Sequence, residues 1–191
     1  MKPSAAAILI GTIGLFTAAC GDSPTSPSQG GSRFVLRLSD SSLRGGQALF
    51  VTFARVRAQR SSGGWVDVPF PGGAAQFTCD LKKLQASDGE IAVGSLPPSP
   101  YTEVRLQIQS ATLYLDNSTS EPACGANLRA PSGRAAPMTV TPNEVSLASQ
   151  FRVEETGDTT MRIGLNTEQS VRLNGDGSYT FAPTIAVLSV S

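Results

Sequence analysis

Apolar and polar side chains alternate along most of the chain after residue 32, and this period of two predicts β-strands rather than helices. Phe34, Leu36 and Leu38 occupy alternate positions of the first such segment, as in a strand with one buried face. The segment 48–54 is apolar at positions of both parities and predicts a central strand. In its continuation, 55–59, the arginines alternate with apolar residues and are expected to point outward.

A change of parity marks one irregularity in the predicted sheet. The apolar residues of 104–108 stand at even positions and those of 111–115 at odd positions. A strand that exchanges its buried face in this way needs an extra residue or a bend, so we expect a β-bulge or a bend near Gln109 and Ser110.

Turn sequences separate the other strands. A Ser-Ser-Gly-Gly turn leads into a short strand that begins at Trp65. The apolar positions of 151–153 and 161–165 predict a pair of strands around a Glu-Thr-Gly-Asp turn.

The C-terminal part continues the β pattern. The sequence Asn174-Gly-Asp-Gly predicts the last hairpin, and 181–187 predicts a closing strand. Pro183 cannot donate a ladder hydrogen bond, so this strand belongs at an edge or a bulge. The segment 79–86 looks briefly helical. About eight or nine short strands with turns between them predict an all-β fold, a two-layer antiparallel β-sandwich over residues 33–191.

The first residues have the pattern of a secretory signal peptide, predicted to be cleaved after residue 19. Lys2 precedes an apolar run over 5–19 that is too short to cross a membrane as a helix, although a retained membrane anchor is the alternative. The sequence Phe16-Thr-Ala-Ala-Cys20 resembles the bacterial lipobox, with threonine where leucine is usual. That resemblance implies acyl chains on Cys20 and anchoring in a membrane. The alternative for Cys20 is a disulfide.

Residues 20–32 predict a flexible tether between the lipidated cysteine and the sandwich. They are rich in Ser, Pro and Gly and contain no large apolar side chain, so they cannot build a core. The mean reach of such a chain is about 20 Å. In some bacteria an aspartate directly after the lipidated cysteine is the signal for retention in the inner membrane, and here Gly21 takes that place. We therefore expect a protein of the bacterial cell envelope, in the outer membrane rather than the inner membrane.

Charge and composition exclude several classes of function. Basic and acidic residues balance at 15 each, so the chain lacks the positive surface that nucleic-acid binding requires. There is no histidine, and the motifs of serine hydrolases, phosphate-binding loops and Cys-x-x-Cys proteins do not occur. We expect no cofactor, no metal and no nucleic-acid partner.

Two cysteines remain in the predicted exported domain, Cys79 and Cys124. An even pair in an oxidising compartment predicts a disulfide, which would attach the polar segment 116–133 to the body of the fold. Two free thiols are the alternative. A catalytic thiol lacks the histidine that would activate it.

Candidate ligand-binding residues are aromatic and arginine side chains on the predicted outward faces. Trp65 and Tyr101 are candidate platforms for stacking against sugar rings, although Trp65 covering one end of the sandwich is the alternative. Arg55 and Arg57 are candidate grips for carboxylate or phosphate groups, together with Arg33, Arg37 and Arg105 if their strands are neighbours. The alternative for these arginines is cross-strand pairing with Glu103, Glu154 or Asp67.

Several sequence features together resemble one known family. They are Trp65, the sequence Phe77-Thr-Cys-Asp-Leu, the sequence Leu96-Pro-Pro-Ser-Pro-Tyr-Thr-Glu-Val-Arg-Leu and the closing Phe181-Ala-Pro-Thr-Ile. Over about residues 34–189 the chain is similar to the bacterial and archaeal lipoprotein family called domain of unknown function 4382. The resemblance implies an exported, lipid-anchored sandwich, transthyretin-like or immunoglobulin-like, with no established activity.

These expectations combine into one functional hypothesis. The chain is expected to be a lipid-anchored, non-catalytic binding module for a carbohydrate, an envelope polymer or a protein. The alternative is an envelope hydrolase that uses an Asp/Glu pair. Two partly buried carboxylates about 5 to 9 Å apart in a cleft would favour the hydrolase.

Overall fold

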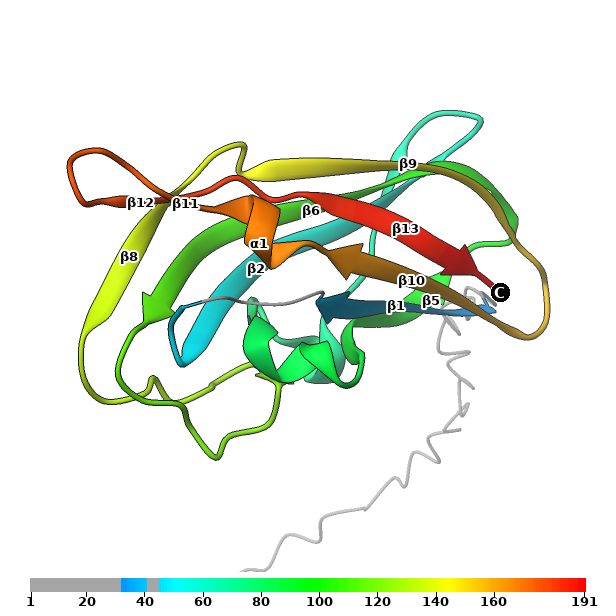
Figure 1. Cartoon of the computed structure of the whole chain (residues 1–191). Helices are drawn as coiled ribbons and strands as arrows, with labels where there is room; N and C mark the ends of the chain where they lie inside the picture. The colour runs from blue at the N-terminus through cyan, green and yellow to red at the C-terminus, as the bar shows by residue number, and fades with distance from the viewer. Residues whose placement is uncertain (1–31, 41–44) are drawn as a thin grey trace, which may run out of the picture.

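Two β-sheets pack face to face across a hydrophobic core in the computed structural model, which describes residues 32–40 and 45–191 (Figure 1). The predicted all-β sandwich is therefore confirmed. The predicted signal peptide (1–19), Cys20 and the tether up to residue 31 lie outside the described residues. No helix in the described part of the chain is long and apolar enough to cross a membrane.

The smaller sheet, sheet A, has four strands. In order across the sheet they are β13 (Ile185–Val190), β10 (Asp158–Leu165), β1 (Ser32–Asp40) and β5 (Gly89–Leu96). Strand β1 pairs with β5 in the antiparallel sense and with β10 in the parallel sense.

The larger sheet, sheet B, has nine strands. Its main path is β11 (Val171–Leu173), β12 (Tyr179–Phe181), β8 (Ala135–Val140), β6 (Ser99–Tyr114), β2 (Ala48–Arg60), β4 (Phe77–Asp80) and β7 (Cys124–Gly125). Two further strands lie off this path, β3 (Trp65–Asp67) on β2 and β9 (Glu144–Val153) on β6. Three short helical segments connect the strands: η1 (Pro71–Gly73), η2 (Leu81–Gln85) and α1 (Thr167–Ser170).

The core follows the alternation seen in the sequence. Phe34, Leu36 and Leu38 of β1 are fully buried, and their sheet packs against the inner face of β2, β6 and β9. The ring of Phe34 stacks on that of Phe151, with ring centroids 5.6 Å apart, and so joins the two sheets. Strand β2 lies between β6 and β4, as expected for a strand that is apolar on both faces.

The predicted irregularity in β6 is present. Thr52 pairs with Ser110 and Phe53 pairs with Ile108, which leaves Gln109 outside the register. At this point β6 changes its second partner, from β9 for the residues up to Gln107 to β8 from Ala111 onward. The segment 79–86, expected to be briefly helical, contains the helical turn η2 at Leu81–Gln85, whereas Cys79 and Asp80 end strand β4. The expected hairpin at Asn174 occurs as the β11–β12 pair.

Two features of strand pairing differ from the sequence prediction. The sandwich includes two parallel pairs, β1 with β10 and β8 with β12. Strands β9 and β10 are not partners either, because β9 pairs with β6 in sheet B and β10 pairs with β1 in sheet A. The predicted closing strand is divided in a similar way. Phe181 ends β12 in sheet B, and β13 begins at Ile185 on the edge of sheet A, with Pro183 in the crossing between them.

The two ends of the sandwich carry different parts of the chain. Ser32, which pairs with Leu96, marks one end, and the last residues of β13 lie there too (Figure 1). We call this end the N-terminal pole. The opposite end, where Ala48 pairs with Tyr114, carries the long segment 116–133, and we call it the loop pole.

Candidate functional site

One outward face of sheet B brings together three of the four predicted ligand residues, and we call it the Trp65 face. It is formed by β3, β2, β6 and β9. Its outward side chains are those of Arg55, Arg57, Gln59, Trp65, Asp67, Glu103, Arg105, Gln107 and Glu144.

The strand alternation explains why these side chains share a face. On β2, Val56 and Ala58 are buried while Arg55 and Arg57 are not, as predicted. Arg57 pairs in register with Arg105 of β6, so two positive charges lie directly opposite each other. Like charges in such a pair repel each other, and a stable sheet needs carboxylates beside them.

Glu144, the first residue of β9, supplies this neutralisation. One carboxylate oxygen accepts a hydrogen bond from Arg57 at 2.8 Å, and the other accepts one from Arg105 at 3.1 Å. Glu103 accepts a further hydrogen bond from Nε of Arg105 at 2.5 Å. The four side chains therefore form a compact network with balanced charge.

Trp65 lies against both cations of this network. The centroid of its ring is 4.9 Å from the guanidinium carbon of Arg57 and 4.5 Å from that of Arg105. Each cation–π contact contributes about 0.5–1 kcal/mol at a site of this exposure. Trp65 remains partly exposed, so its ring is held in position by the arginines while part of it stays accessible to solvent.

The electrostatics of the network suit binding better than acid–base chemistry. The hydrogen bond from the Arg105 guanidinium holds the pKa of the Glu103 carboxyl below its ordinary value, and the same contact raises the pKa of Arg105. Glu103 is therefore ionised at neutral pH. A glycoside hydrolase needs one carboxyl group with a raised pKa as general acid, and Glu103 has the opposite shift.

Arg55 lies on the same face but belongs to a separate ion pair. Its Nε is 3.1 Å from Asp67, and both side chains are more than half exposed. The five outward arginines considered from the sequence do not form one ridge. Arg33 and Arg37 are on β1 of sheet A, in the other layer of the sandwich. Cross-strand pairing with Asp67, one of the alternatives considered above, is what the structure shows for Arg55. Arg105 instead pairs with Glu103 on its own strand, β6, and across strands with Glu144 of β9.

Tyr101, the fourth predicted ligand residue, is in the core rather than on the surface. Its residue is 1 % exposed, and its ring stacks on that of Phe151. A register shift between Tyr101 and Glu103 turns the tyrosine inward, which the alternation in the sequence does not reveal. The hydroxyl donates to the carbonyl of Pro97 at 2.9 Å, much as in the tyrosine corner of immunoglobulin-like sandwiches. Tyr101 is therefore not available as a stacking platform.

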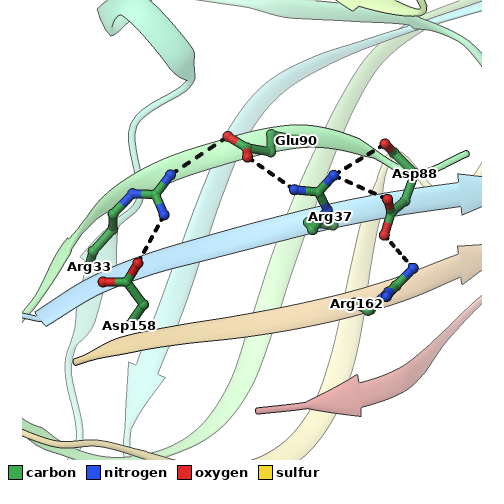
Figure 2. Close-up of polar contacts among 6 residues, drawn as sticks. All are labelled: Arg33, Arg37, Asp88, Glu90, Asp158 and Arg162. Carbon is green, nitrogen blue, oxygen red and sulfur yellow. Dashed lines mark hydrogen bonds and ion pairs between the residues drawn. The ribbon is translucent and has the colours of Figure 1, made fainter.

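A second charged cluster covers the outer face of sheet A (Figure 2). The ion pairs join side chains of β1, β5 and β10 and the segment just before β5. They are Arg33–Asp158, Arg33–Glu90, Arg37–Glu90, Arg37–Asp88 and Arg162–Asp88, at 2.6 to 3.8 Å. Val35 points to this outer side and is 2 % exposed. The aliphatic parts of long side chains can cover such a residue. The cluster joins three cations to three anions, so its charge is balanced and it links three strands of sheet A.

The predicted disulfide between Cys79 and Cys124 is present. It joins β4 to β7 and so attaches the segment 116–133 to sheet B. Lys83 strengthens the attachment, because its ammonium group donates to the backbone carbonyls of Thr119, at 2.6 Å, and Glu121. This long segment is therefore held in a fixed conformation at the loop pole.

Asp80, beside the disulfide, is a buried carboxyl whose pKa is raised by loss of solvation. One of its oxygens accepts hydrogen bonds from the backbone of Leu49 and Lys82, so it caps the η2 turn. Its residue has no exposed surface, and a substrate therefore has no access to it. No group of three or more potential metal ligands occurs in residues 32–40 and 45–191.

Sequence reasoning did not identify Glu144, which joins the two arginines beneath Trp65. Glu144 is 39 residues from Arg105 and 87 from Arg57. A local pattern has no information on which distant strand becomes the neighbour of β6.

Comparison with known proteins finds a match to one family model. The model described as "Domain of unknown function (DUF4382)" matches residues 31–183, well over half of the chain. Comparison with curated proteins and comparison with solved structures found no match. The matched range contains the whole Trp65 face and both cysteines of the disulfide. The family resemblance noted in the sequence is thereby confirmed, and the chain belongs to the DUF4382 family.

Proposed function

We propose that this chain is a lipid-anchored protein of the bacterial cell envelope, held in the outer membrane through acyl chains on Cys20, and that its sandwich is a non-catalytic binding module. Its ligand would be a carbohydrate, an envelope polymer or another protein. The sequence of the first 20 residues supports the location. The observation that carries the binding role is the Trp65 ring, fixed over Arg57 and Arg105 on a rigid sheet yet partly exposed.

A surface of this kind is suited to recognition. Side chains that are already held in one conformation lose little entropy when a ligand binds, which favours affinity. The carboxylates beside Trp65 are bound to arginines, and Asp80, a carboxyl with a raised pKa, is sealed in the interior. The geometry therefore supports binding more strongly than hydrolysis.

The location is tested with the full-length chain and a Cys20→Ala variant, both carrying a C-terminal tag and expressed in a bacterium that has an outer membrane. We expect the wild type in the outer-membrane fraction, with a mature N-terminal peptide whose mass includes acyl chains. The variant should lack this modification and leave the membrane fraction. An unmodified Cys20 peptide from mature wild-type protein would disprove the lipid anchor.

The binding role is tested by affinity capture from intact envelopes with the full-length chain, followed by identification of the retained material. We expect a ligand that is retained by the wild type and recovered unchanged. Capture of nothing above the level of a tag-only control would count against a binding module. Release of new reducing ends from envelope polysaccharide would instead support the hydrolase alternative.

A further inference from the structure

An open hollow lies beside the Trp65 face, with exposed residues of β6 on one side and core residues of β8 on the other. Its polar and apolar lining includes Gln107, Gln109, Ser110, Met138, Val140 and Asn143. The hollow lies where β6 changes its neighbour from β9 to β8 and where Gln109 stands outside the register. Divergence of two neighbouring strands at a bulge leaves space that the sheet itself does not fill.

The hollow and Trp65 belong to one continuous surface. Gln107 lines the hollow and is the next outward residue on β6 after Arg105, about 7 Å along the strand. Gln107 also pairs in register with Glu144, the carboxylate that joins the arginines beneath Trp65. An extended ligand that lies along β6 would therefore touch the indole ring and then the hollow.

The chemical groups along this surface, from Trp65 to the hollow, are of two complementary kinds. Trp65 offers a flat ring in a fixed position, and the side-chain amides of Gln107 and Gln109 have no hydrogen-bond partner within the described residues. An amide both donates and accepts hydrogen bonds, so it matches a hydroxyl group in either role. A pyranose ring has an apolar C–H face and a rim of hydroxyl groups, which is the chemistry that an aromatic ring with neighbouring amides recognises.

The charges on the track indicate which carbohydrates fit. Arg55 is paired with Asp67, and Arg57 and Arg105 are paired with Glu144, with Glu103 bound to Arg105 as well. Three cations therefore face three carboxylates. A surface with balanced charge has no net attraction for a polyanion, and its carboxylates would repel one that approached closely.

We propose that the Trp65 face and the adjoining hollow form a binding track for a neutral polysaccharide. One pyranose ring stacks on Trp65, and the following units reach the amides of the hollow. This inference rests on the proposed function, because it names the ligand class of that binding module.

The first experiment uses Trp65 as its own reporter, since it is the one tryptophan in the chain. The full-length protein is purified in a zwitterionic detergent without a sugar headgroup, because an alkyl maltoside would compete for the site. Its fluorescence is titrated with neutral hexasaccharides (malto-, cello-, xylo- and mannohexaose) and with oligogalacturonate of the same length. We expect at least one neutral oligosaccharide to shift the emission of Trp65 and oligogalacturonate to bind at least tenfold more weakly. The affinity for the neutral ligand should not change between 50 and 500 mM NaCl, because an uncharged ligand is not screened.

Variants then locate the bound ligand, with affinities measured by calorimetry on protein that retains wild-type circular dichroism. Trp65→Ala should weaken binding about tenfold, whereas Trp65→Phe should stay within about threefold of the wild type because a ring is retained. Gln107→Ala should weaken binding of the hexasaccharide about fivefold and leave binding of the matching disaccharide unchanged. Gln169→Ala, an exposed glutamine on α1, is the matched control and should bind like the wild type.

Three results would overturn the inference while leaving the proposed function intact. One is envelope capture of a ligand by the wild type together with no binding of any neutral hexasaccharide at millimolar concentration. Another is preferential, salt-dependent binding of oligogalacturonate. The third is neutral-sugar binding that Trp65→Ala and Gln107→Ala leave unchanged. If the chain retains no envelope ligand and binds no oligosaccharide, the proposed function fails together with this inference.

Discussion

Breaking the Cys79–Cys124 disulfide is expected to destabilise the sandwich by about 4 kcal/mol, almost entirely through the unfolded state. The two cysteines are 45 residues apart in the sequence. In the chain-entropy model, closing a loop of that length removes about 13 cal/mol/K from the unfolded ensemble, which is about 4 kcal/mol at 25 °C. Domains of this size are typically stable by about 5–15 kcal/mol, so the expected loss is a large part of the total.

The folded state itself should change little on reduction, because other contacts hold the same segment. Lys83 donates to two carbonyls of the segment, and the backbone of Asp80 donates to the carbonyl of Ala123 at 2.7 Å. At its base, Arg134 binds Asp116 through two guanidinium nitrogens. The segment should therefore keep its place, and the free energy lost should approach the value calculated for the unfolded chain.

The assay compares guanidinium chloride unfolding of the oxidised full-length chain with that of protein reduced and alkylated under denaturing conditions. The double variant Cys79→Ala/Cys124→Ala provides a second form without the bridge, although it also removes a fully buried sulfur. We expect a lower free energy of unfolding and a larger m-value in both forms, since an unfolded chain without a cross-link exposes more surface. A difference below about 1 kcal/mol with an unchanged m-value would refute the reasoning. Thiol titration of denatured, unreduced protein first confirms that the bridge is formed.

Two further predictions concern packing and acid stability. Gly94→Ala should destabilise the fold by about 1–3 kcal/mol, because the added Cβ would lie 2.4 Å from Cδ of Pro69, which is part of a rigid ring. Gly175→Ala is the control, since a Cβ at that position meets nothing within 4 Å. Its free energy of unfolding, measured by chemical denaturation, should stay within about 0.5 kcal/mol of that of the wild type. Protonation of Asp88 should make the protein lose stability in acid. The hydrogen bond from Arg37 lowers the pKa of the Asp88 carboxyl in the folded state. The contribution of Asp88 to the free energy of unfolding is therefore fully present above the ordinary aspartate pKa of about 4 and is lost as the pH falls through the lowered value. Asp88→Asn should flatten this part of the stability curve, and a curve as steep as that of the wild type between about pH 2 and 5 would contradict this assignment.

For long strands such as β1 and β2 the sequence predicted both the strand and the side that most of its side chains occupy, because both depend on neighbouring residues. The strands β4, β5, β7 and β8 were not predicted. The apolar alternation in β1 and β2 directly gives the buried residues, and it placed Arg55 and Arg57 on the outside. The change of parity near Gln109 gave the position of the bulge. These features are local consequences of a backbone in which successive side chains point to opposite faces.

Strand partners and the details of the candidate site could not be predicted in this way. The parallel pairing of β1 with β10 joins Arg33 to Asp158, which is 125 residues away, and no local pattern marks that partnership. The same limit hid Glu144 beside Arg105. Tyr101 was predicted on the wrong face of its strand for a different reason. A register shift between Tyr101 and Glu103 turns the tyrosine side chain to the inner face, while the apolar alternation of the residues after it is unchanged. Pairing between distant strands and register shifts of one residue thus determine which side chains lie on the outer face and which of them are neighbours in the candidate site.

The arrangement of the sheets connects the proposed anchor with the proposed binding track. The described chain begins at Ser32 on β1, in sheet A, whereas the Trp65 face of the track is the outward face of sheet B. Sheets in a sandwich pack about 10 Å apart, so the strand that the proposed anchor precedes belongs to the layer opposite the Trp65 face. The track also follows β6, away from the N-terminal pole, with Trp65 nearer that pole and the hollow further along the strand. A polysaccharide on this track would therefore extend along the strands rather than across them, and only the units beyond the one stacked on Trp65 would reach the hollow, so the hollow should govern the preference for longer chains.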